Sequence, residues 1–385
     1  MLNKLYNSLS LLLLSSVVHA ANPWQWNMPQ GVTPISHDMY QLHMIAMWVC
    51  AGIGLVVFGV MFYSLLYHRK SKGHKPATFH HNQYVEIIWT IIPFVILVGL
   101  AVPATQILMR MDDTDNAELT IKVVGYQWKW EYSYLEHNVN FFSSLATPYK
   151  QINNQDAKNE WYLLEVDHPV VVPIHKKIRF LVTSNDVIHS WWVTKLGIKR
   201  DAIPGFMHEA WARIEKPGTY RGQCTELCGV YHGFMPIVVH AVPEDEFNRW
   251  IASQQKQPTP ETRHLSRQAL MTLGKEKYEA VCAACHQPNG RGIPPLYPAL
   301  KGSSVAVGHP IVRHIDLILN GVEGSAMQPY RDQLNDEEIA AIVTYERNAW
   351  ENNTDEEVQP DEVAAARQQN QQPVRIKTAQ KGGIQ

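Results

Sequence analysis

The segment CTELCGVYHGFM, residues 224–235, places two thiols, an imidazole and a thioether within twelve residues. The donors are Cys224, Cys228, His232 and Met235, and such soft ligands favour copper, whereas calcium and magnesium take oxygen ligands. The cysteines are too far apart for the commonest zinc knuckle, and a thioether is a poor zinc ligand. A short disulfide is the alternative, because disulfides are common outside the cytosol. The segment therefore predicts a soft-metal loop in competition with a disulfide.

Length, charge and cysteine usage narrow the class of protein. A chain of 385 residues predicts two or three domains. The net charge is −2 and no basic patch with interleaved aromatic residues is present, which argues against a nucleic-acid partner. Four of the five cysteines form two close pairs, each followed by a histidine, which indicates two metal or cofactor sites rather than a disulfide framework. The fifth, Cys50, lies in an apolar run and is interpreted as a packing residue.

The N-terminus has the features of an export signal. Residues 1–20 contain Lys4, an apolar stretch and a small-residue cleavage site that ends at Ala20. An uncleaved first membrane helix is the alternative, but the apolar stretch is short for it. The sequence therefore predicts a signal peptide over residues 1–20.

Residues 21–112 are predicted to form an N-terminal segment and a transmembrane hairpin. The runs 42–67 and 87–109 contain no charged residue, and each exceeds the roughly 20 residues that a helix needs to cross a bilayer. The loop 68–75 between them has four Lys or Arg and no acid, so the positive-inside rule places it in the cytoplasm. Everything after the hairpin then faces the periplasm or an equivalent outer space.

Glu86 lies at the start of the second apolar run, beside the cytoplasmic loop. Acids at membrane depth are costly and often mark proton paths. An interfacial carboxylate that simply reaches water is the competing interpretation. The residues alone leave both open.

Residues 113–252 change character and predict an all-β sandwich or barrel. Short runs rich in Val, Ile, Trp and Tyr alternate with Pro, Gly and Asn-Asp breaks. Residues 135–160 are polar and irregular, and their pattern assigns no element. A short helix over 244–252 follows Pro243 and closes the unit. The predicted strands are 118–124, 126–134, 161–166, 170–174, 178–183, 189–194, 210–214, 219–223 and 236–242.

The last part of the chain predicts a linker, a helical domain and a tail. Residues 253–263 are polar and contain two prolines, as linkers do. Residues 351–385 are rich in Gln, Asn and charge, and they predict a disordered tail. Between them, residues 264–350 have apolar residues at helical spacing over 265–281, 310–319 and 336–349, the last with a predicted capping box of Asn335 and Glu338.

The helical domain carries CAACH at residues 282–286, which matches the C-x-x-C-H attachment site of a c-type haem. Cys282 and Cys285 would add to the two vinyl groups of the porphyrin, and His286 would be the proximal ligand. Met327 is the only methionine after His286, and a thioether ligand raises the haem potential and suits electron transfer.

Two further observations concern the haem. His309 and His314 stay open as alternatives to Met327 for the distal ligand, because either could supply a second imidazole. The segment PPLYP, residues 294–298, is a stiff loop that is predicted to pack on the haem edge.

The metal loop needs a ligand from another strand, and His189 in DVIHSWW, residues 186–192, offers one. A lone histidine is usually a satisfied core residue, but a second imidazole is required to complete two copper ions. Two thiolates that bridge two coppers would let one electron spread over both ions. The geometry of such a copper centre changes little on reduction, and this favours fast electron transfer.

The sequence resembles subunit II of the haem-copper cytochrome c oxidases, in the variant with a fused C-terminal cytochrome c domain. Five segments in order carry the resemblance, which covers residues 25–350. It implies a multidomain chain with a two-helix transmembrane hairpin, an all-β cupredoxin-like domain and an all-α cytochrome c domain. The segments are VEIIWTIIP at 85–93, GYQWKWEY at 125–132, DVIHSW at 186–191, GIKRDAIPG at 197–205, and residues 224–236.

The resemblance assigns roles around a binuclear copper centre called CuA. Cys224 and Cys228 would bridge the two ions. One copper would be completed by His189 and Met235, and the other by His232 and the backbone carbonyl of Glu226. The Glu226 side chain would contribute to a magnesium site shared with subunit I. The resemblance further implies that Trp128 is the electron entry residue and Glu86 the mouth of a proton channel.

The resemblance also implies a function and partners. Electrons would pass from haem c to CuA and on to haem and copper centres of subunit I, where oxygen is reduced with proton pumping. Subunit III is a second expected partner, and a soluble cytochrome c or another upstream cytochrome is a candidate donor. The expected location is the bacterial inner membrane, with two passes in contact with lipid and the soluble domains in the periplasm.

Three other functions remain in competition. The first is a membrane-anchored copper and haem carrier for a different terminal reductase. The second is a quinol-oxidase counterpart without metal, which the intact cysteine pair disfavours. The third is a nitrous oxide reductase, which the membrane hairpin disfavours. Asp112, Asp113 and Asp115 are candidate docking charges for a soluble cytochrome, although solvated linker charges are the simpler interpretation.

Overall fold

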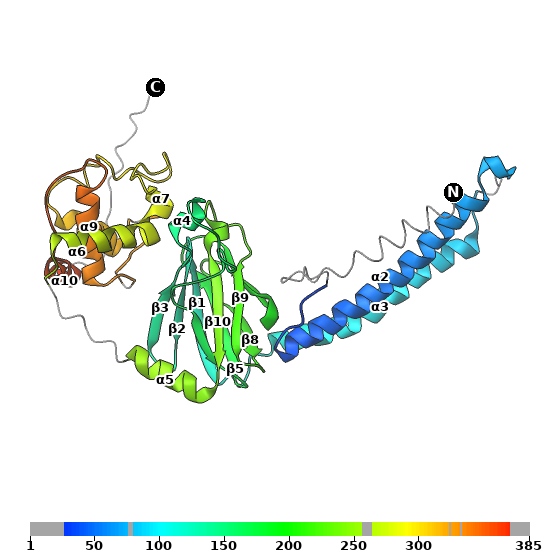
Figure 1. The fold of residues 1–385 in the computed structure, drawn as a ribbon. Coiled ribbons are helices and arrows are strands. Elements are labelled where there is room, and N and C mark those ends of the chain that lie inside the picture. The colour runs from blue at the N-terminus through cyan, green and yellow to red at the C-terminus, as the bar shows by residue number, and fades with distance from the viewer. Residues whose placement is uncertain (1–26, 76–79, 256–263, 323–324, 332, 370–385) are drawn as a thin grey trace, which may run out of the picture. The chain divides into compact units, whose positions relative to one another are not determined.

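The computed structural model describes residues 27–75, 80–255, 264–322, 325–331 and 333–369 (Figure 1). The predicted signal peptide lies outside the described residues, as do residues 256–263 of the predicted linker. The chain forms two compact units. One comprises the residues up to 104 apart from 32–35, and the other comprises residues 32–35 and everything from 105 onward.

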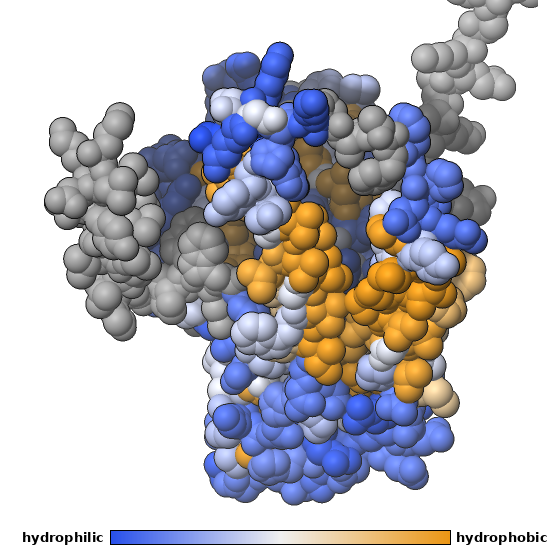
Figure 2. Space-filling model, turned by 90° about the vertical axis from the view of Figure 1, so that its right-hand side faces the viewer, coloured by the Kyte–Doolittle hydropathy of each residue, from blue (hydrophilic) through white to orange (hydrophobic). Residues whose placement is uncertain are grey.

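Two long helices, α2 (Pro34–Tyr67) and α3 (Gln83–Asp112), form the hairpin, with the short turn η1 (Lys70–Lys72) between them. Both are long and apolar enough to cross a membrane, and the most apolar window of each is unburied. Leu55, for example, is 79% exposed. A helix in a soluble core would hide such side chains, so this surface requires lipid or partner helices. Figure 2 shows hydrophobic side chains gathered over a broad area of the molecule.

The β domain consists of two five-stranded sheets with the orders β3-β2-β1-β5-β8 and β4-β10-β9-β6-β7. Each sheet contains one parallel pair, β1 with β5 and β4 with β10, among antiparallel neighbours. Large side chains such as Trp130, Phe180 and Trp191 are fully buried in the shared core. The predicted all-β cupredoxin-like domain is confirmed. The strands are β1 (Leu119–Tyr126), β2 (Lys129–Tyr134), β3 (Val139–Ser143), β4 (Val170–Pro173), β5 (Lys177–Ser184), β6 (His189–Val193), β7 (Ile198–Ala202), β8 (His208–Arg213), β9 (Gly218–Cys224) and β10 (Pro236–Val242).

The structure corrects the strand assignment in three places. Residues 161–166 do not form a strand, because Leu163 adopts a left-handed φ of 61° and only Val166 makes an isolated bridge. The unassigned stretch 135–160 contains β3, which forms a hairpin with β2, and the short helix α4 (Tyr149–Ile152). The polar strand β7 was not predicted, because its lysine, arginine and aspartate interrupt the apolar pattern, yet it pairs with β6 along its whole length.

The C-terminal region is helical, as predicted. Gly274 is required where α6 crosses α9, because a Cβ there would lie 2.1 Å from the Ala341 carbonyl oxygen. The predicted capping box at the start of α9 is confirmed, since Asn335 and Glu338 each accept a hydrogen bond from the other's backbone N–H. The elements are α5 (Glu244–Gln255), α6 (Arg267–Lys277), η4 (Tyr278–Cys282), α7 (Ala283–His286), α8 (Val312–Asn320), α9 (Asp336–Asn348) and α10 (Pro360–Gln369).

Helix α10 contradicts part of the predicted disordered tail. Val358, Val363 and Ala366 are buried in the core of the helical domain. Arg367 anchors the far end of the helix by donating a hydrogen bond to Asp336 at 2.8 Å. The prediction was wrong here because it used the average composition of residues 351–385, which is polar. The three apolar residues that join the buried core are too few to change that average. Residues 370–385 lie outside the described residues.

Candidate copper and haem sites

The copper loop is closed by two paired strands. Strand β9 ends at Cys224 and β10 begins directly after Met235, and the two strands pair antiparallel with Pro236 opposite Gln223. The Cys224 N–H donates to the Met235 carbonyl at 3.0 Å and so ties the two ends of the loop together. Cys224 and Met235 are therefore brought side by side by the register of the sheet.

Strand β6 supplies the third donor. It pairs with β9 so that Trp191 lies opposite Cys224, which places His189 beside the same thiol. One ligand atom from each of His189, Cys224 and Cys228 lies within 4.8 Å of the others, and all three residues are buried. The His189 Nδ1 atom is 3.9 Å from the Cys224 sulfur.

The two cysteines are free thiols, with their sulfur atoms 3.8 Å apart. A disulfide requires about 2.05 Å, so the competing disulfide interpretation is not supported. The His232 Nδ1 atom lies 3.5 Å from the Cys228 sulfur, and the Glu226 carbonyl oxygen lies 3.4 Å from the Cys224 sulfur. The Glu226 side chain is exposed. Two buried thiols flanked by two imidazoles, a carbonyl and the nearby Met235 fit a soft binuclear metal centre.

The ring of His189 is held from behind by Asp186. The Asp186 carboxylate lies 2.8 Å from Nε2, which leaves Nδ1 free to face the cysteines. Burial would lower the pKa of His189, but hydrogen bonds to Asp186 and Cys224 outweigh it and raise that pKa. Gly125 makes room for the ring, since a Cβ there would lie 2.8 Å from the His189 Cδ2 atom. Such an outer carboxylate fixes the orientation of a ligating histidine.

The two thiols differ in their readiness to ionise. Hydrogen bonding from Cys228 and from His189 lowers the pKa of Cys224. The neighbouring Cys224 and burial raise the pKa of Cys228. The Cys224 thiol therefore loses its proton readily. The negative charge of the Cys224 thiolate then opposes the ionisation of Cys228. Bound cations would remove this opposition, because metal binding stabilises thiolates and releases their protons.

Trp128 lies at the edge of the copper loop. Its indole N–H donates to the Cys228 carbonyl at 3.2 Å, and the residue is buried. Gly229 makes this contact possible, because a Cβ there would lie 3.0 Å from the indole ring and its φ of 117° suits glycine. The structure therefore brings the predicted electron entry residue into direct contact with a predicted copper ligand.

The predicted haem ligands lie at the junction of η4 and α7. Cys282 ends η4, and Cys285 and His286 lie in α7. The His286 Nδ1 atom is 2.9 Å from the Pro298 carbonyl oxygen, which leaves Nε2 available as an axial ligand. Burial raises the pKa of Cys285 to about 11 and also raises the pKa of Cys282 well above its usual value. Two protonated thiols beside an anchored imidazole fit the covalent attachment of a haem.

The distal position favours Met327. Met327 and Cys282 pack against the same hydrophobic core of the helical domain. His309 is exposed and lies 3.3 Å from Glu356, and the buried His314 lies 2.7 Å from Glu346. Both histidines therefore have carboxylate partners, whereas within the described part of the chain no hydrogen bond involves the Met327 thioether. Met327 as the axial ligand stays a prediction.

The predicted loop 294–298 lies between the two sites. Tyr297 hydrogen-bonds to Cys285, and its ring centroid is 6.4 Å from that of Trp128. Cys285 and Tyr297 both pack with the hydrophobic core of the β domain. This loop therefore contacts both a cysteine that is predicted to attach haem and the β domain.

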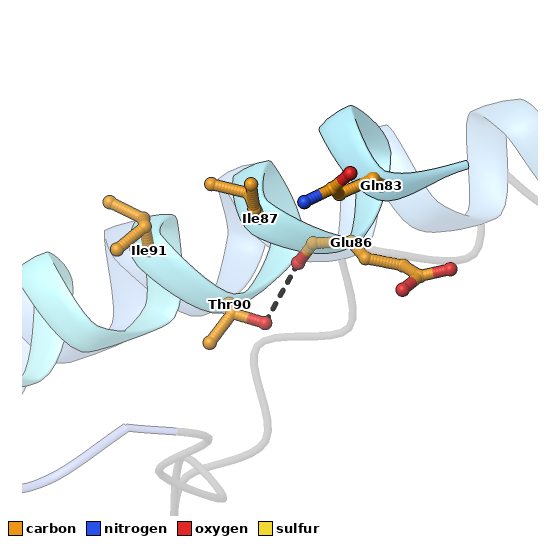
Figure 3. Close-up of a pocket in the computed structure, with 5 residues that line it drawn as sticks. All are labelled: Gln83, Glu86, Ile87, Thr90 and Ile91. Carbon is orange, nitrogen blue, oxygen red and sulfur yellow. Dashed lines mark hydrogen bonds between the residues drawn. The ribbon is translucent and has the colours of Figure 1, made fainter. Parts of the chain in front are cut away.

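Glu86 lies in the first turn of α3 (Figure 3). Its backbone carbonyl accepts a hydrogen bond from the Thr90 hydroxyl at 2.8 Å. Figure 3 shows its carboxylate extended away from Ile87 and Ile91. The described contacts leave its role in a proton channel as a prediction.

Sequence reasoning missed several residues that shape the copper site. Asp186 and Gly125 stood inside segments that were singled out, but neither received a role. Gln127 donates from its side chain to the Cys228 carbonyl at 2.8 Å, and Gly229 admits Trp128. The sequence offered two local signals. Asp186 stands three residues before the candidate ligand His189, and Gly229 directly follows the candidate ligand Cys228.

The fold and the sites define a class of protein, namely a membrane-anchored redox chain with a cupredoxin-like domain and a cytochrome c domain. Three family models match in the same order. They are the transmembrane domain of cytochrome c oxidase subunit II at residues 21–107, its periplasmic domain at residues 119–242, and "Cytochrome C oxidase, cbb3-type, subunit III" at residues 269–345. The chain belongs to the cytochrome c oxidase subunit II family, in a form with a fused C-terminal cytochrome c domain.

Curated relatives agree with the family models. A probable cytochrome c oxidase subunit 2 of Rickettsia bellii is 41% identical over 251 residues, which cover 64% of this chain and 91% of the relative. The mitochondrial cytochrome c oxidase subunit 2 of Glycine max is 39% identical over 237 residues, covering 61% of this chain and 60% of the relative. The chain is thus a subunit of an oxidoreductase complex and associates with a subunit I.

A solved structure is also similar in sequence. The periplasmic domain of subunit II of the cytochrome oxidase of Bradyrhizobium japonicum is 41% identical. The match covers 37% of this chain and 97% of that chain, with a TM-score of 0.34. The family implies copper in the β domain and haem c in the helical domain, together with a membrane anchor and an extramembrane domain.

Proposed function

We propose that this chain passes electrons from a covalently bound haem c to a binuclear CuA centre and on to the oxygen-reducing site of subunit I, coupled to proton pumping. The observation that carries the proposal is the buried cluster of His189, Cys224 and Cys228, with Trp128 in contact with its edge. A copper centre in this cluster supplies reversible one-electron chemistry, and the haem supplies the preceding step.

The residues of this chain divide the work. Cys224 and Cys228 hold both coppers, His189 and Met235 complete one, and His232 with the Glu226 carbonyl completes the other. Asp186 keeps the His189 ring oriented through its 2.8 Å contact. In the haem domain, Cys282 and Cys285 hold the porphyrin, while His286 and Met327 bind the iron.

Further parts of the proposal lie outside the two redox sites. The exposed Glu226 side chain contributes to a magnesium site at the contact with subunit I. Subunit III is a second partner within the complex. A soluble cytochrome c or another upstream cytochrome supplies electrons to the haem. The complex lies in a bacterial inner membrane, with the β and haem domains in the periplasm.

Metal and haem analysis of the full chain, purified apart from its partners, tests the proposal. Two coppers and one haem c per chain are expected. The matched control is Cys224→Ser, which should lose copper and keep haem. A chain with haem c but no copper would contradict the proposal and favour a quinol-oxidase counterpart.

An alternative is a membrane-anchored carrier for a different terminal reductase, and the two redox sites in one chain would serve it equally well. Co-purification with a large many-helix subunit separates the two functions. A purified complex without such a subunit would exclude the oxidase function.

Glu86→Gln tests the proton-channel role. The amide keeps the shape of the side chain but cannot carry a proton as a carboxylate does, so we expect turnover to fall at least several-fold. Electron entry into CuA, followed by single-turnover reduction, should not change. The control is Gln83→Ala on the same turn. Normal turnover in Glu86→Gln would make this residue an interfacial carboxylate.

A further inference from the structure

The turn between β1 and β2 is the point where the copper domain meets the haem domain. It consists of Gln127 and Trp128, and β2 begins with Lys129. Trp128 contacts the copper loop on one side, and its ring faces Tyr297 of the haem domain on the other. This one turn therefore contacts residues next to both predicted redox centres.

Gln127 makes three hydrogen bonds from this turn. Its backbone N–H donates to the Asp186 carboxylate at 2.7 Å, and Asp186 in turn orients His189. Its side-chain amide donates to the Cys228 carbonyl at 2.8 Å. Its backbone carbonyl accepts from the Gln328 side-chain amide at 2.9 Å. The first two bonds lead to copper ligands, and the third leads to the haem domain.

Gln328 directly follows Met327, the predicted axial ligand, and the backbone at Met327 makes two hydrogen bonds to nearby described residues. The Val322 N–H donates to the Met327 carbonyl at 2.7 Å, and the Met327 N–H donates to the Ser325 hydroxyl at 3.1 Å. Gly321 allows this closure, since a Cβ there would lie 2.5 Å from the Met327 carbonyl oxygen. Because Gln328 is peptide-bonded to Met327, a displacement of Gln328 would act directly on these contacts of Met327.

Other contacts surround the Gln127–Gln328 bond. Lys129 donates to the Gln333 side chain, and its ammonium lies 4.3 Å from the ring centroid of Tyr330. The Gln287 amide donates to the Tyr231 hydroxyl at the longer distance of 3.4 Å. The Gln287 bond also joins the neighbour of a predicted haem ligand, His286, to the neighbour of a predicted copper ligand, His232, but the Gln328 bond is the shorter of the two.

We propose that Gln328 is a positioning residue for electron transfer: its amide seats the Met327 loop on the Gln127 carbonyl and so fixes the haem relative to the copper loop. The same bond closes a continuous path from Met327 through Gln328 and Gln127 to Cys228. The proposal rests on the proposed function, because it matters only if electrons pass between these centres.

The chemistry of the bond suits this task. An uncharged amide on a backbone carbonyl is insensitive to pH and little screened by salt, unlike an exposed ion pair. The acceptor belongs to the backbone of the turn, so its place is set by the β1–β2 pairing. Gln328 therefore selects one docked arrangement of the haem domain.

The test is Gln328→Leu in the full chain within the assembled complex. We expect hydrogen exchange in a peptide that covers residues 126–130 to become about tenfold faster, the factor that corresponds to one lost net hydrogen bond. Flash-induced electron transfer from haem c to CuA should slow by a similar factor. The haem potential and the CuA absorbance should not change.

The matched control is Gln268→Leu on the exposed face of α6, which makes the same chemical change and should leave both rates as in the parent chain. Gln328→Glu keeps the side-chain shape but removes the donor, and it should reproduce the slowing. It also serves as the test variant if Gln328→Leu fails to assemble haem.

Two results would overturn the proposal. Unchanged exchange and transfer rates would show that the amide does not seat the haem domain. Slower transfer with a shifted haem potential would show that the variant disturbs the axial ligand instead. A parent complex that lacks CuA absorbance or haem c would refute the proposed function itself, which is a distinct outcome.

Discussion

The copper region and the haem region hold their ligands in different ways. Around the copper loop, the donors lie at or between the ends of strands that pair within one sheet, and three ligand atoms lie within 4.8 Å of one another. In the haem region, the donors come from a short helix, a turn and a separate loop. Strand pairing therefore positions the predicted copper donors, whereas the predicted haem donors come from separate helical segments and a loop.

The thiols of the two regions differ in the same sense. Hydrogen bonds from Cys228 and His189 lower the pKa of Cys224, while burial raises the pKa of Cys282. A thiolate is the form that binds metal, and its formation is favoured at Cys224, whereas the neighbouring Cys224 and burial raise the pKa of Cys228. Burial favours the protonated form of both predicted haem cysteines. Predictions that separate the two sites follow from this contrast.

The largest expected effect is the loss of copper in Cys224→Ser. A hydroxyl is a poor soft-metal ligand, so the bridged centre should not form and the mixed-valence copper absorption should disappear. Haem c absorption should remain, because the haem ligands lie in the other domain. Absorption spectra and copper analysis of the purified chain measure both. Copper absorption that persists unchanged would contradict the ligand assignment.

The converse variant, Cys282→Ala with Cys285→Ala, should lose covalent haem and leave copper bound. We also expect the helical domain to unfold at a lower temperature than the β domain, because the group that its ligands surround is missing. Thermal unfolding of the variant, followed by circular dichroism, should then show two transitions, with the helical domain unfolding first. In the parent chain the haem should raise the unfolding temperature of the helical domain. A single unchanged transition would mean that this domain does not depend on its haem.

The same contrast explains how far the sequence could predict the structure. The copper and haem motifs are short and local, so Cys224, Cys228 and the CAACH segment were recognised from spacing alone. Gln127 acts through a hydrogen bond to Cys228, 101 residues away, which no local pattern reports, whereas Asp186 stands only three residues before His189 and did carry a local signal. Strand β7 and helix α10 were missed because each is stabilised by contacts with neighbouring elements rather than by a strong pattern of its own.

Met327→His tests the distal haem position with an intermediate effect. An imidazole in place of the thioether stabilises ferric haem, so the midpoint potential should fall by on the order of 0.1 V, within the ~0.8 V span that axial ligands cover. A redox titration of the haem absorption measures it, and His309→Ala serves as the control without a shift. An unchanged potential in Met327→His would assign the distal ligand elsewhere, with His314 the next candidate.

The smallest expected effect concerns Lys129, where the two regions touch. Burial lowers the pKa of Lys129 to about 7, against 10.5 when exposed. Between these values the unfolded chain binds one more proton than the folded chain, so stability rises with pH, by up to about 1.4 kcal/mol per unit. Below pH 7 both states carry the proton and the dependence vanishes. Unfolding of the haem domain at pH 7 and pH 9, followed by haem absorption, should show this gain.

Lys129→Met removes the titrating group and should flatten the rise in stability between pH 7 and pH 9. The matched control is Lys275→Met on α6, where the lysine is 61% exposed and its loss should leave the rise intact. A rise that survives in Lys129→Met would mean that the ammonium is solvated and that the haem domain does not cover it. A flattened rise would instead support the contact between β2 and the haem domain. The hydrogen bond from Gln328 to Gln127 belongs to the same contact region.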